Sequence, residues 1–252
     1  MTVATKPVSQ WQQLPQAVVA LLIGWMFTLT AASVFAAGVS TDADPEGPAQ
    51  TAYAPEKGSG PVILVISGQS GPARYQTYAA EVAGLGYYAV LVDGKDILTR
   101  DKTGVTNFRK AIARAQSSPH AVPGKVAVIG FSQGGGGALL HAAGVPDLVS
   151  VVVTYYPFTS FRAGAVSLVQ NFRVPVLVFA GGRDMYNNCC LIESARAMAA
   201  VAKESGAKFE LVVYPEADHG FNHQESRPYR RDDDRDAWRR TTEMLRLHHP
   251  LR

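Results

Sequence analysis

Short runs of consecutive apolar residues, many of them β-branched, recur along the chain from residue 61 onward. They cover residues 61–67, 87–93, 125–129, 148–155, 174–180 and 208–214. A strand that is apolar at every position, rather than at alternate positions, is typical of a parallel sheet covered on both faces. The runs therefore predict six strands of such a sheet.

Segments with apolar residues at helical spacing separate most of these runs. They cover residues 75–85, 105–117, 132–143 and 191–205, and a final segment covers 232–248. Strands that alternate with helices of this length are joined by right-handed crossovers. We therefore predict the α/β fold class, with a mostly parallel, twisted sheet and helices on both faces.

The first 40 residues differ in composition from the rest of the chain. Residues 7–40 carry no charged side chain, and residues 17–37 are continuously apolar or small. Such a run approaches the roughly 20 residues that span a bilayer, and the small residues near its end are typical of a cleavage site. We expect residues 1–37 to be a signal peptide or an N-terminal membrane anchor.

The remaining residues fall into two parts. Residues 38–60 are rich in Pro, Gly, Asp and Ala without a sustained period, so we predict a linker with one short edge strand near residues 51–53. Residues 61–252 are expected to form one α/β catalytic domain. This domain is predicted to be exported to the periplasm or secreted, or else to be anchored to the membrane by residues 17–37.

The charge distribution argues against a nucleic-acid partner. The net charge is only +3, and most local charge lies in a C-terminal segment where both signs alternate. Proteins that follow a phosphate backbone usually carry a basic stripe. We therefore expect a small-molecule partner and no nucleic acid, with membrane contact only through an uncleaved N-terminal segment. The sequence leaves the oligomeric state open.

The predicted strand 125–129 runs into the motif Gly130-Phe131-Ser132-Gln133-Gly134 and leaves it as a helix. This strand-turn-helix context is that of a nucleophile elbow, in which a sharp turn exposes a serine hydroxyl. Glycines flank the serine because so tight a turn leaves no room for bulky side chains. Ser132 is therefore the candidate nucleophile.

A carboxylate and an imidazole follow two later strands. Asp184 lies just after the predicted strand 174–180, and His219 lies just after 208–214. In an open parallel sheet, ligands bind at the carboxyl ends of the strands. The chain order Ser132, Asp184, His219 is the order of the α/β-hydrolase triad. His219 would take the serine proton, and Asp184 would orient the imidazole.

Rival residues and the remaining parts of the site were also considered. Asp218 is the rival acid and His223 the rival base. The backbone N–H groups of Gln133 and Gln69 are the candidate oxyanion hole. A pocket is expected from side chains in the loops that follow the strands, namely Arg74, Tyr75, Tyr156, Phe158, Met185 and Tyr186.

Three motifs resemble those of the dienelactone hydrolase family of α/β-hydrolases, over roughly residues 61–247. They are the six residues from Gly130 to Gly135, then Gly182-Arg183-Asp184, and then His219-Gly220-Phe221. The resemblance implies a compact hydrolase without a large lid domain that acts on esters or lactones through a nucleophile-Asp-His triad. Dienelactone hydrolases proper use a cysteine nucleophile, whereas this chain has Ser132. The difference favours a general carboxylic-ester hydrolase, for which no cofactor and no metal are expected.

Other functions remain open on the sequence. The same triad could serve a peptidase or an acyltransferase, and the chain could be a non-catalytic binding protein on a hydrolase fold. Residues 227–231 could gate a pocket for an anionic substrate. The two cysteines, Cys189 and Cys190, are adjacent, so a vicinal disulfide and two separate thiols are both open. Because no His stands at ligand spacing from them, a zinc site is not expected.

Overall fold

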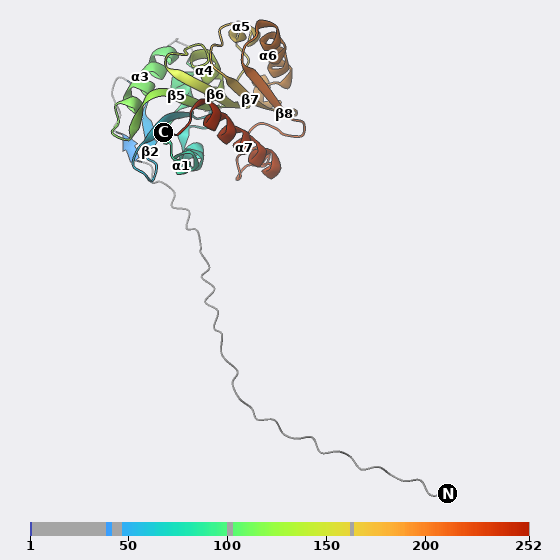
Figure 1. Ribbon diagram of the computed structural model, residues 1–252. Helices are drawn as coiled ribbons and strands as arrows, with labels where there is room; N and C mark the ends of the chain where they lie inside the picture. Colours follow the sequence, from blue (N-terminus) through green and yellow to red (C-terminus); the bar gives the residue numbers. More distant parts are fainter. Residues whose placement is uncertain (2–38, 42–46, 100–102, 162–163, 252) are drawn as a thin grey trace. The chain divides into compact units, whose positions relative to one another are not determined.

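The computed structural model describes Met1 and residues 39–41, 47–99, 103–161 and 164–251 (Figure 1). Within these residues, an eight-stranded sheet has the strand order β1-β2-β4-β3-β5-β6-β7-β8. No helix in this part of the chain is both long and apolar enough to cross a membrane. Apart from Met1, the predicted signal peptide or anchor over residues 1–37 lies outside the described residues.

The elements alternate along the chain as the apolar runs predict. The strands are β1 (Val39–Thr41), β2 (Gln50–Tyr53), β3 (Gly60–Ile66), β4 (Tyr88–Val92), β5 (Ala121–Phe131), β6 (Val149–Tyr155), β7 (Val176–Gly181) and β8 (Phe209–Tyr214). The α-helices are α1 (Gln76–Gly84), α2 (Gly94–Ile97), α3 (Gly104–Gln116), α4 (Gln133–His141), α5 (Val166–Val169), α6 (Ile192–Ser205) and α7 (Arg231–His248). Two 3-10 helices, η1 (Pro72–Tyr75) and η2 (Tyr186–Asn188), lie in loops.

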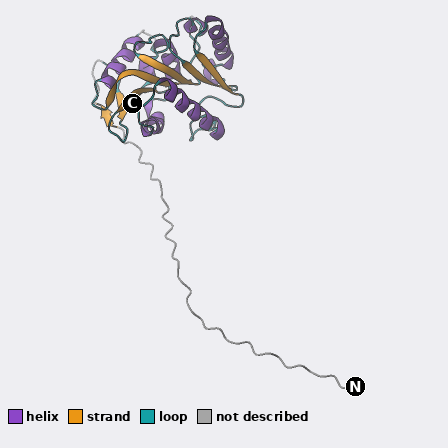
Figure 2. Ribbon diagram, viewed as in Figure 1, coloured by secondary structure: helices purple, strands orange, loops and turns teal. Residues whose placement is uncertain are grey.

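The sheet is covered on both faces, and Figure 2 shows it between two layers of helix. Alternate residues of β3 belong to different cores, because successive side chains of a strand point to opposite faces. Val62, Leu64 and Ile66 belong to the core that also holds residues of α3, α4 and α6, whereas Ile63 and Val65 belong to the core that holds residues of α1 and α7. The predicted α/β fold is confirmed, and no large lid domain is present among the described residues.

The prediction of a linker over residues 38–60 with one edge strand is wrong where it leaves out β1. β1 and β2 lie in this range and extend the sheet, because β2 pairs antiparallel with β4 and β1 pairs antiparallel with β2. The expected edge strand near 51–53 is thus present as β2, but β1 lies outside it at the edge. The folded domain therefore includes these two strands ahead of residue 61.

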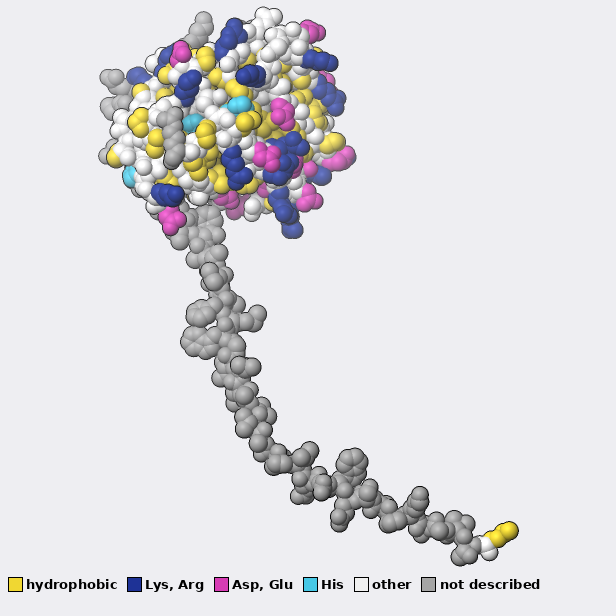
Figure 3. Space-filling model, viewed as in Figure 1, with side chains coloured by type: hydrophobic (Ala, Val, Ile, Leu, Met, Phe, Trp, Pro, Cys, Tyr) yellow, Lys and Arg dark blue, Asp and Glu magenta, His cyan; other side chains and the backbone are white. Residues whose placement is uncertain are grey.

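The charges near the C-terminus lie on the surface of α7. Its first turn carries three aspartates at positions 232–234, and its last turn carries Arg246 and His248. Acidic groups at the start and basic groups at the end of a helix both interact favourably with its dipole. On the face shown in Figure 3, basic and acidic side chains are interspersed, so no broad patch of one sign is visible there.

Candidate active site

Ser132 occupies the sharp turn between β5 and α4. Its backbone has φ 48° and ψ −114°, a left-handed conformation that is uncommon for residues other than glycine. The glycines on either side are needed for close packing. A Cβ on Gly130 would lie 2.6 Å from the carbonyl oxygen of Gly134, and a Cβ on Gly134 would collide with the backbone of Ile66 and Ser67. The turn therefore holds Ser132 at the carboxyl edge of the sheet.

The structure brings Asp184 and His219 to this serine in a continuous row. The Ser132 Oγ lies 2.9 Å from His219 Nε2, and His219 Nδ1 lies 2.7 Å from Asp184 Oδ2. Asp184 is 1% exposed, and its second oxygen accepts a hydrogen bond from the Tyr186 N–H. Because Asp184 can only accept when ionised, His219 donates from Nδ1 and leaves Nε2 able to accept the serine proton.

The rival residues have other contacts. Asp218 turns back on the chain, because its Oδ1 accepts a hydrogen bond of 2.7 Å from the backbone N–H of His219. His223 Nε2 lies 3.2 Å from the Tyr156 hydroxyl and 3.3 Å from the Tyr75 hydroxyl. Each rival is thus held in a hydrogen bond other than those of the Ser132–His219–Asp184 row.

Two tyrosine rings fix the imidazole of His219 between them. The Tyr186 ring stacks on it with centroids 4.5 Å apart and an interplanar angle of 11°, and Tyr156 meets it edge-on at 4.7 Å. Tyr156 itself has a positive φ of 37°, and its hydroxyl donates a 2.7 Å hydrogen bond to Asn222. The imidazole is therefore confined by ring contacts as well as by its two hydrogen bonds.

A second histidine in this region is held neutral. Burial is the main cause that lowers the pKa of His223 to about 4, and the charges of Arg74 and His219 lower it further. A neutral His223 can share hydrogen bonds with the hydroxyls of Tyr75 and Tyr156 without adding charge beside His219. This buried network forms one wall next to the Ser132–His219 contact.

The two predicted oxyanion donors lie in segments next to Ser132. Gln133 begins α4, so its N–H belongs to the first turn, whose N–H groups have no partner inside the helix. Gln69 lies in the loop after β3, directly after Gly68. A Cβ on Gly68 would lie 3.3 Å from the Ser132 Cβ, so this loop packs against the candidate nucleophile.

The row opens into a cavity of about 790 Å³. Of the predicted pocket residues, five line it together with Ser132, His219 and Gln69: Arg74, Tyr75, Tyr156, Met185 and Tyr186. The sixth, Phe158, does not. Its ring packs on Phe161 at 5.3 Å, and its N–H donates to the Ser132 carbonyl, so it supports the turn from behind. Its assignment to the pocket is therefore wrong.

The comparison with protein families agrees with the strand-turn-helix motif. The model of the dienelactone hydrolase family matches residues 93–249, which is more than half of the chain. The chain belongs to this family. Ser132, Asp184 and His219 all lie inside the matched range.

This family member is similar to several known proteins. A protein of Escherichia coli K12 assigned as a carboxymethylenebutenolidase is 29% identical over 48% of this chain, and the match spans 46% of that protein. The chain thus matches about half the length of that curated relative. A solved structure from Klebsiella pneumoniae, assigned as a dienelactone hydrolase, has a TM-score of 0.72 at 19% identity and covers 83% of this chain and 97% of that one.

A second similar structure is that of Thermogutta terrifontis esterase 2 phosphorylated by paraoxon. It has a TM-score of 0.63 at 20% identity and covers 86% of this chain and 96% of that one. At these identities the likeness of the two solved structures shows that the dienelactone hydrolase family member shares their fold.

The sequence indicated only part of the cavity wall that follows β8, through the possible gate at residues 227–231. Residues 226–230 and Gly220 line the cavity, with Glu216 and Asp218 beside them. The basic run at 227–231 is the signal that hints at this wall, and Arg227 and Arg230 do line the cavity. Their placement depends on the turns after His219, which the sequence pattern does not specify.

The two adjacent cysteines are joined as a vicinal disulfide before α6. Cys189 and Cys190 are both buried, and their sulfur atoms and a ring nitrogen of His219 all lie within 4.8 Å of one another. The sequence argument against a metal site looked for a histidine close to the cysteines along the chain. The fold supplies one from a different loop.

Proposed function

We propose that this protein is an exported serine hydrolase that cleaves carboxylic esters or lactones through an acyl-enzyme. The observation that carries the proposal is the hydrogen-bonded row from Ser132 through His219 to Asp184, with Ser132 on a strained turn. Membership of the dienelactone hydrolase family supports ester or lactone chemistry. A serine in the nucleophile position favours general carboxylic esters.

The first half of the reaction forms the acyl-enzyme. A serine hydroxyl is a weak nucleophile at neutral pH, so a base must take its proton during attack on the carbonyl carbon. His219 Nε2, at 2.9 Å from the Ser132 Oγ, has the distance and the tautomer for this step. Asp184 at Nδ1 holds the ring in place and stabilises the imidazolium that forms. The imidazolium then donates its proton to the leaving alcohol.

The tetrahedral intermediate places a negative charge on the former carbonyl oxygen. The N–H groups of Gln133 and Gln69 are proposed to donate to this oxygen. Removal of one such donor typically costs about a hundredfold to a thousandfold in rate. Because only proline removes a backbone N–H, and it also fixes the backbone φ angle, the loop after β3 is best tested at Gly68. A Cβ there would press on the Tyr75 hydroxyl and the Ser132 Cβ.

The second half of the reaction releases the acid. Water attacks the acyl carbonyl, His219 takes a proton from that water, and the Ser132 oxygen leaves with a proton returned by His219. The 790 Å³ cavity reaches the row, and Met185, one of the residues that line it, is 67% exposed to solvent. Water can therefore approach the acyl group from the same side as the substrate.

The walls of the cavity suggest a substrate of modest size. Tyr75, Tyr156 and Tyr186 offer apolar ring surface to the cavity. Arg74 and Arg227 add charged groups to its lining. Small-molecule sites combine apolar walls with a few polar groups that fix orientation. We propose short-chain esters and small lactones as the substrate class.

Export is proposed from the composition of residues 1–37, with cleavage after the apolar segment or retention as an anchor. N-terminal sequencing of protein recovered from the host's periplasm or medium tests it. A mature chain that begins near residue 38 supports cleavage and export. A chain that begins at Met1 and stays in the soluble cytoplasmic fraction contradicts both forms of the proposal.

The reaction class is tested with the purified chain and short-chain p-nitrophenyl esters. We expect a burst of p-nitrophenol equal to the enzyme concentration when acylation outpaces deacylation, and no turnover by Ser132→Ala. An acyl-amino-acid p-nitroanilide and an added alcohol acceptor distinguish the alternatives. Faster cleavage of the anilide would favour a peptidase, and preferential transfer to the alcohol would favour an acyltransferase. A folded wild-type chain without activity on any of them would contradict the proposal.

A further inference from the structure

The vicinal disulfide lies beside the histidine that the reaction uses. Cys189 and Cys190 are 7% and 4% exposed, and their sulfur atoms lie within 4.8 Å of a ring nitrogen of His219. The cysteines precede α6, whereas His219 follows β8, so the fold assembles the group from two separate loops. While the sulfur atoms are bonded to each other, neither is a thiolate, and the group cannot bind a cation in the manner of cysteine ligands.

The backbone around the two cysteines is anchored by neighbours that do not involve the S–S bond. The Cys189 carbonyl accepts a 2.8 Å hydrogen bond from the Thr159 N–H, and the Thr159 hydroxyl lies 3.3 Å from the same oxygen. The Ser160 hydroxyl donates to the Asn188 carbonyl at 2.6 Å. Breaking the S–S bond removes none of these contacts, so both thiols would remain close to His219.

We propose that reduction of the Cys189–Cys190 bond creates a site in which the two thiolates and a ring nitrogen of His219 bind a thiophilic divalent cation such as Zn²⁺ or Cd²⁺. Two thiolates and an imidazole are a ligand set that zinc accepts, with one position of the tetrahedron left open. With Zn–S bonds of about 2.3 Å, two thiolates of a tetrahedral site stand roughly 3.8 Å apart. Adjacent cysteines can open to this separation by side-chain rotation.

The chemistry of the change is a two-electron reduction followed by metal binding. A dithiol reductant attacks the S–S bond through a mixed disulfide and closes to its own disulfide, which leaves two cysteine thiols. The cation then displaces one proton from each thiol and binds the two thiolates. No other oxidant or reductant is needed.

Metal binding would interrupt the Ser132–His219–Asp184 row whichever nitrogen is used. If the cation binds Nε2, the Ser132 hydroxyl loses its hydrogen-bond acceptor. If it binds Nδ1, the hydrogen bond between His219 and Asp184 is lost. The reduced protein would therefore be inhibited by the cation, and the oxidised protein would not. The inhibition rests on the proposed function of His219, whereas the metal site itself does not.

Cadmium binding to the full-length chain tests the site without reference to hydrolysis. The chain contains two cysteines, so a thiol assay reports directly whether the disulfide is open. After reduction and removal of the reductant under anaerobic conditions, we expect the ultraviolet absorption of Cd²⁺–thiolate bonds to rise to one Cd²⁺ per chain. The oxidised chain should show no such rise.

Four variants assign the ligands. The double variant Cys189→Ser/Cys190→Ser should bind no Cd²⁺. Loss of a residue that merely orients a metal ligand costs 10–100-fold in affinity, so loss of the ligand itself in His219→Gln should weaken binding by roughly a hundredfold or more. His120→Gln is the matched control, because this histidine is exposed and lies outside the group, and it should leave Cd²⁺ affinity unchanged.

The fourth variant, Ser132→Ala, separates the two proposals. It should abolish hydrolysis and still bind Cd²⁺ in the reduced state. The metal proposal is overturned if the folded chain with two free thiols binds no Cd²⁺, if the oxidised chain binds it equally well, or if His219→Gln leaves the affinity unchanged. If Cd²⁺ binds as expected and the wild type hydrolyses no ester, the metal site stands and the proposed function fails.

Discussion

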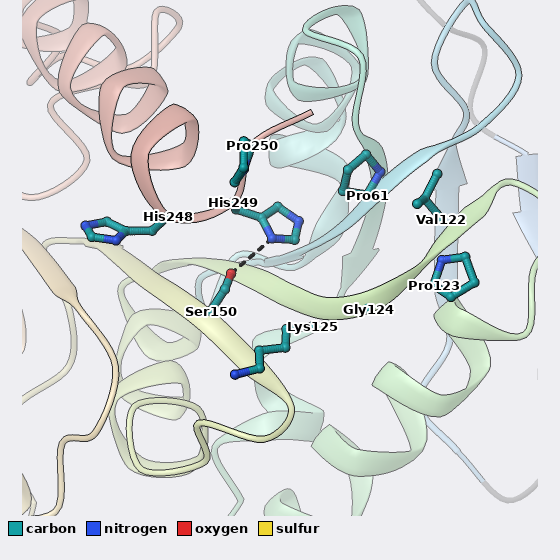
Figure 4. Close-up of a pocket in the computed structure, with 9 residues that line it drawn as sticks. All are labelled: Pro61, Val122, Pro123, Gly124, Lys125, Ser150, His248, His249 and Pro250. Carbon is teal, nitrogen blue, oxygen red and sulfur yellow. Dashed lines mark hydrogen bonds between the residues drawn. The ribbon is translucent and has the colours of Figure 1, made fainter. Parts of the chain in front are cut away.

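Two regions of this molecule contain a serine in contact with a histidine and a tyrosine ring stacked on that histidine. At the carboxyl edge of the sheet, Ser132 contacts His219, on which Tyr186 stacks. In the second region, the Ser150 Oγ lies 3.0 Å from His249 Nδ1 (Figure 4). The Tyr87 ring stacks on the His249 ring with centroids 5.7 Å apart. The pair alone therefore does not define a catalytic site.

The surroundings of the two pairs differ in backbone and in hydrogen bonding. Ser150 lies within β6, and its hydroxyl is also 3.3 Å from the Val126 carbonyl. Ser132 instead lies in the turn after β5 and has a positive φ. His249 Nδ1 meets the serine itself, and the Tyr87 hydroxyl donates to the His249 carbonyl. His219 instead meets the serine with Nε2 and a buried carboxylate with Nδ1.

The hollow beside Ser150 also differs in the charged side chains that line it. Its volume is about 400 Å³, and no acidic side chain is among the described residues that line it, which are Pro61, Val122, Pro123, Gly124, Lys125, Ser150, His248, His249 and Pro250. In the candidate active site, Asp184 is placed to stabilise the protonated form of the His219 imidazole during attack. The comparison teaches that the acid and the strained turn, rather than the serine-histidine contact, distinguish the candidate active site.

The largest effect should come from exchanging the two serines for alanine. Ser132→Ala removes the nucleophile and should lower kcat by about 10⁶-fold, as loss of a nucleophile does where the triad acts as a unit. Ser150→Ala should leave kcat unchanged and cost about 1 kcal/mol of stability, because it removes one hydrogen-bonding hydroxyl. Ester turnover and thermal unfolding measure the two effects. Equal losses of activity in both variants would break the comparison.

The next effect should come from the carboxylate that is hydrogen-bonded to His219. Asp184→Asn keeps the shape of the side chain but removes its charge, so kcat should fall by about ten-thousandfold. Asp218→Asn is the matched control, since an amide oxygen can still accept the hydrogen bond from the His219 N–H. Its activity should stay within a few-fold of wild type. If Asp218→Asn lost activity and Asp184→Asn retained it, Asp218 and not Asp184 would be the acid of the triad.

A third effect concerns how the free energy of unfolding depends on pH. The pKa of His223 is about 4 in the folded protein, below the ordinary value of 6.5, so between these values the unfolded chain binds more protons. Stability should therefore decline as the pH falls from about 6.5 to about 4, by about 3 kcal/mol for this group.

Replacement of His223 by a residue that does not titrate tests this effect. His223→Gln should flatten the decline in denaturant unfolding measured across this pH range. His248, which lines the hollow beside Ser150, is the control. Partial burial lowers its pKa as well. His248→Gln should change the slope less than His223→Gln does. An unchanged slope in His223→Gln would contradict the assignment.

The smallest effect should come from the stacked rings. Tyr186→Ala removes a ring contact worth about 0.5–1.5 kcal/mol, so kcat/KM should fall by up to about tenfold, and Tyr186→Phe should restore most of it. Tyr87 is buried, so Tyr87→Ala should lower the free energy of unfolding by about 3–5 kcal/mol without changing kcat per folded molecule. Wild-type kinetics in Tyr186→Ala would show that the Tyr186 ring does not help to position His219.

Much of this architecture could be predicted from the sequence because its signals are local. The continuous apolar runs identified the parallel strands, and the strand-end positions of Ser132, Asp184 and His219 indicated which side chains meet at one edge. β1 escaped prediction because three residues with no apolar run carry no periodic signal. The one-turn helices α2 and α5 are too short for a helical period to show.

Features that depend on loop geometry could not be predicted. Phe158 and Tyr156 are close neighbours after β6, yet Tyr156 lines the cavity and Phe158 does not. The positive φ of Tyr156 comes directly after the end of β6, and the sequence pattern does not indicate it. The approach of Cys189 and Cys190 to His219 likewise joins loops that are distant in sequence. Such contacts are set by tertiary packing rather than by residue spacing.

The most direct test of the account is to locate the covalent adduct formed by an organophosphate. Paraoxon, which phosphorylates the structurally similar Thermogutta terrifontis esterase 2, would be incubated with the folded full-length chain, followed by peptide mass spectrometry. The account predicts one phosphoryl adduct on Ser132, none on Ser150, and loss of the adduct in His219→Gln and Asp184→Asn on the same time scale. An adduct on another residue, or a wild-type chain that turns over esters without labelling at Ser132, would contradict it.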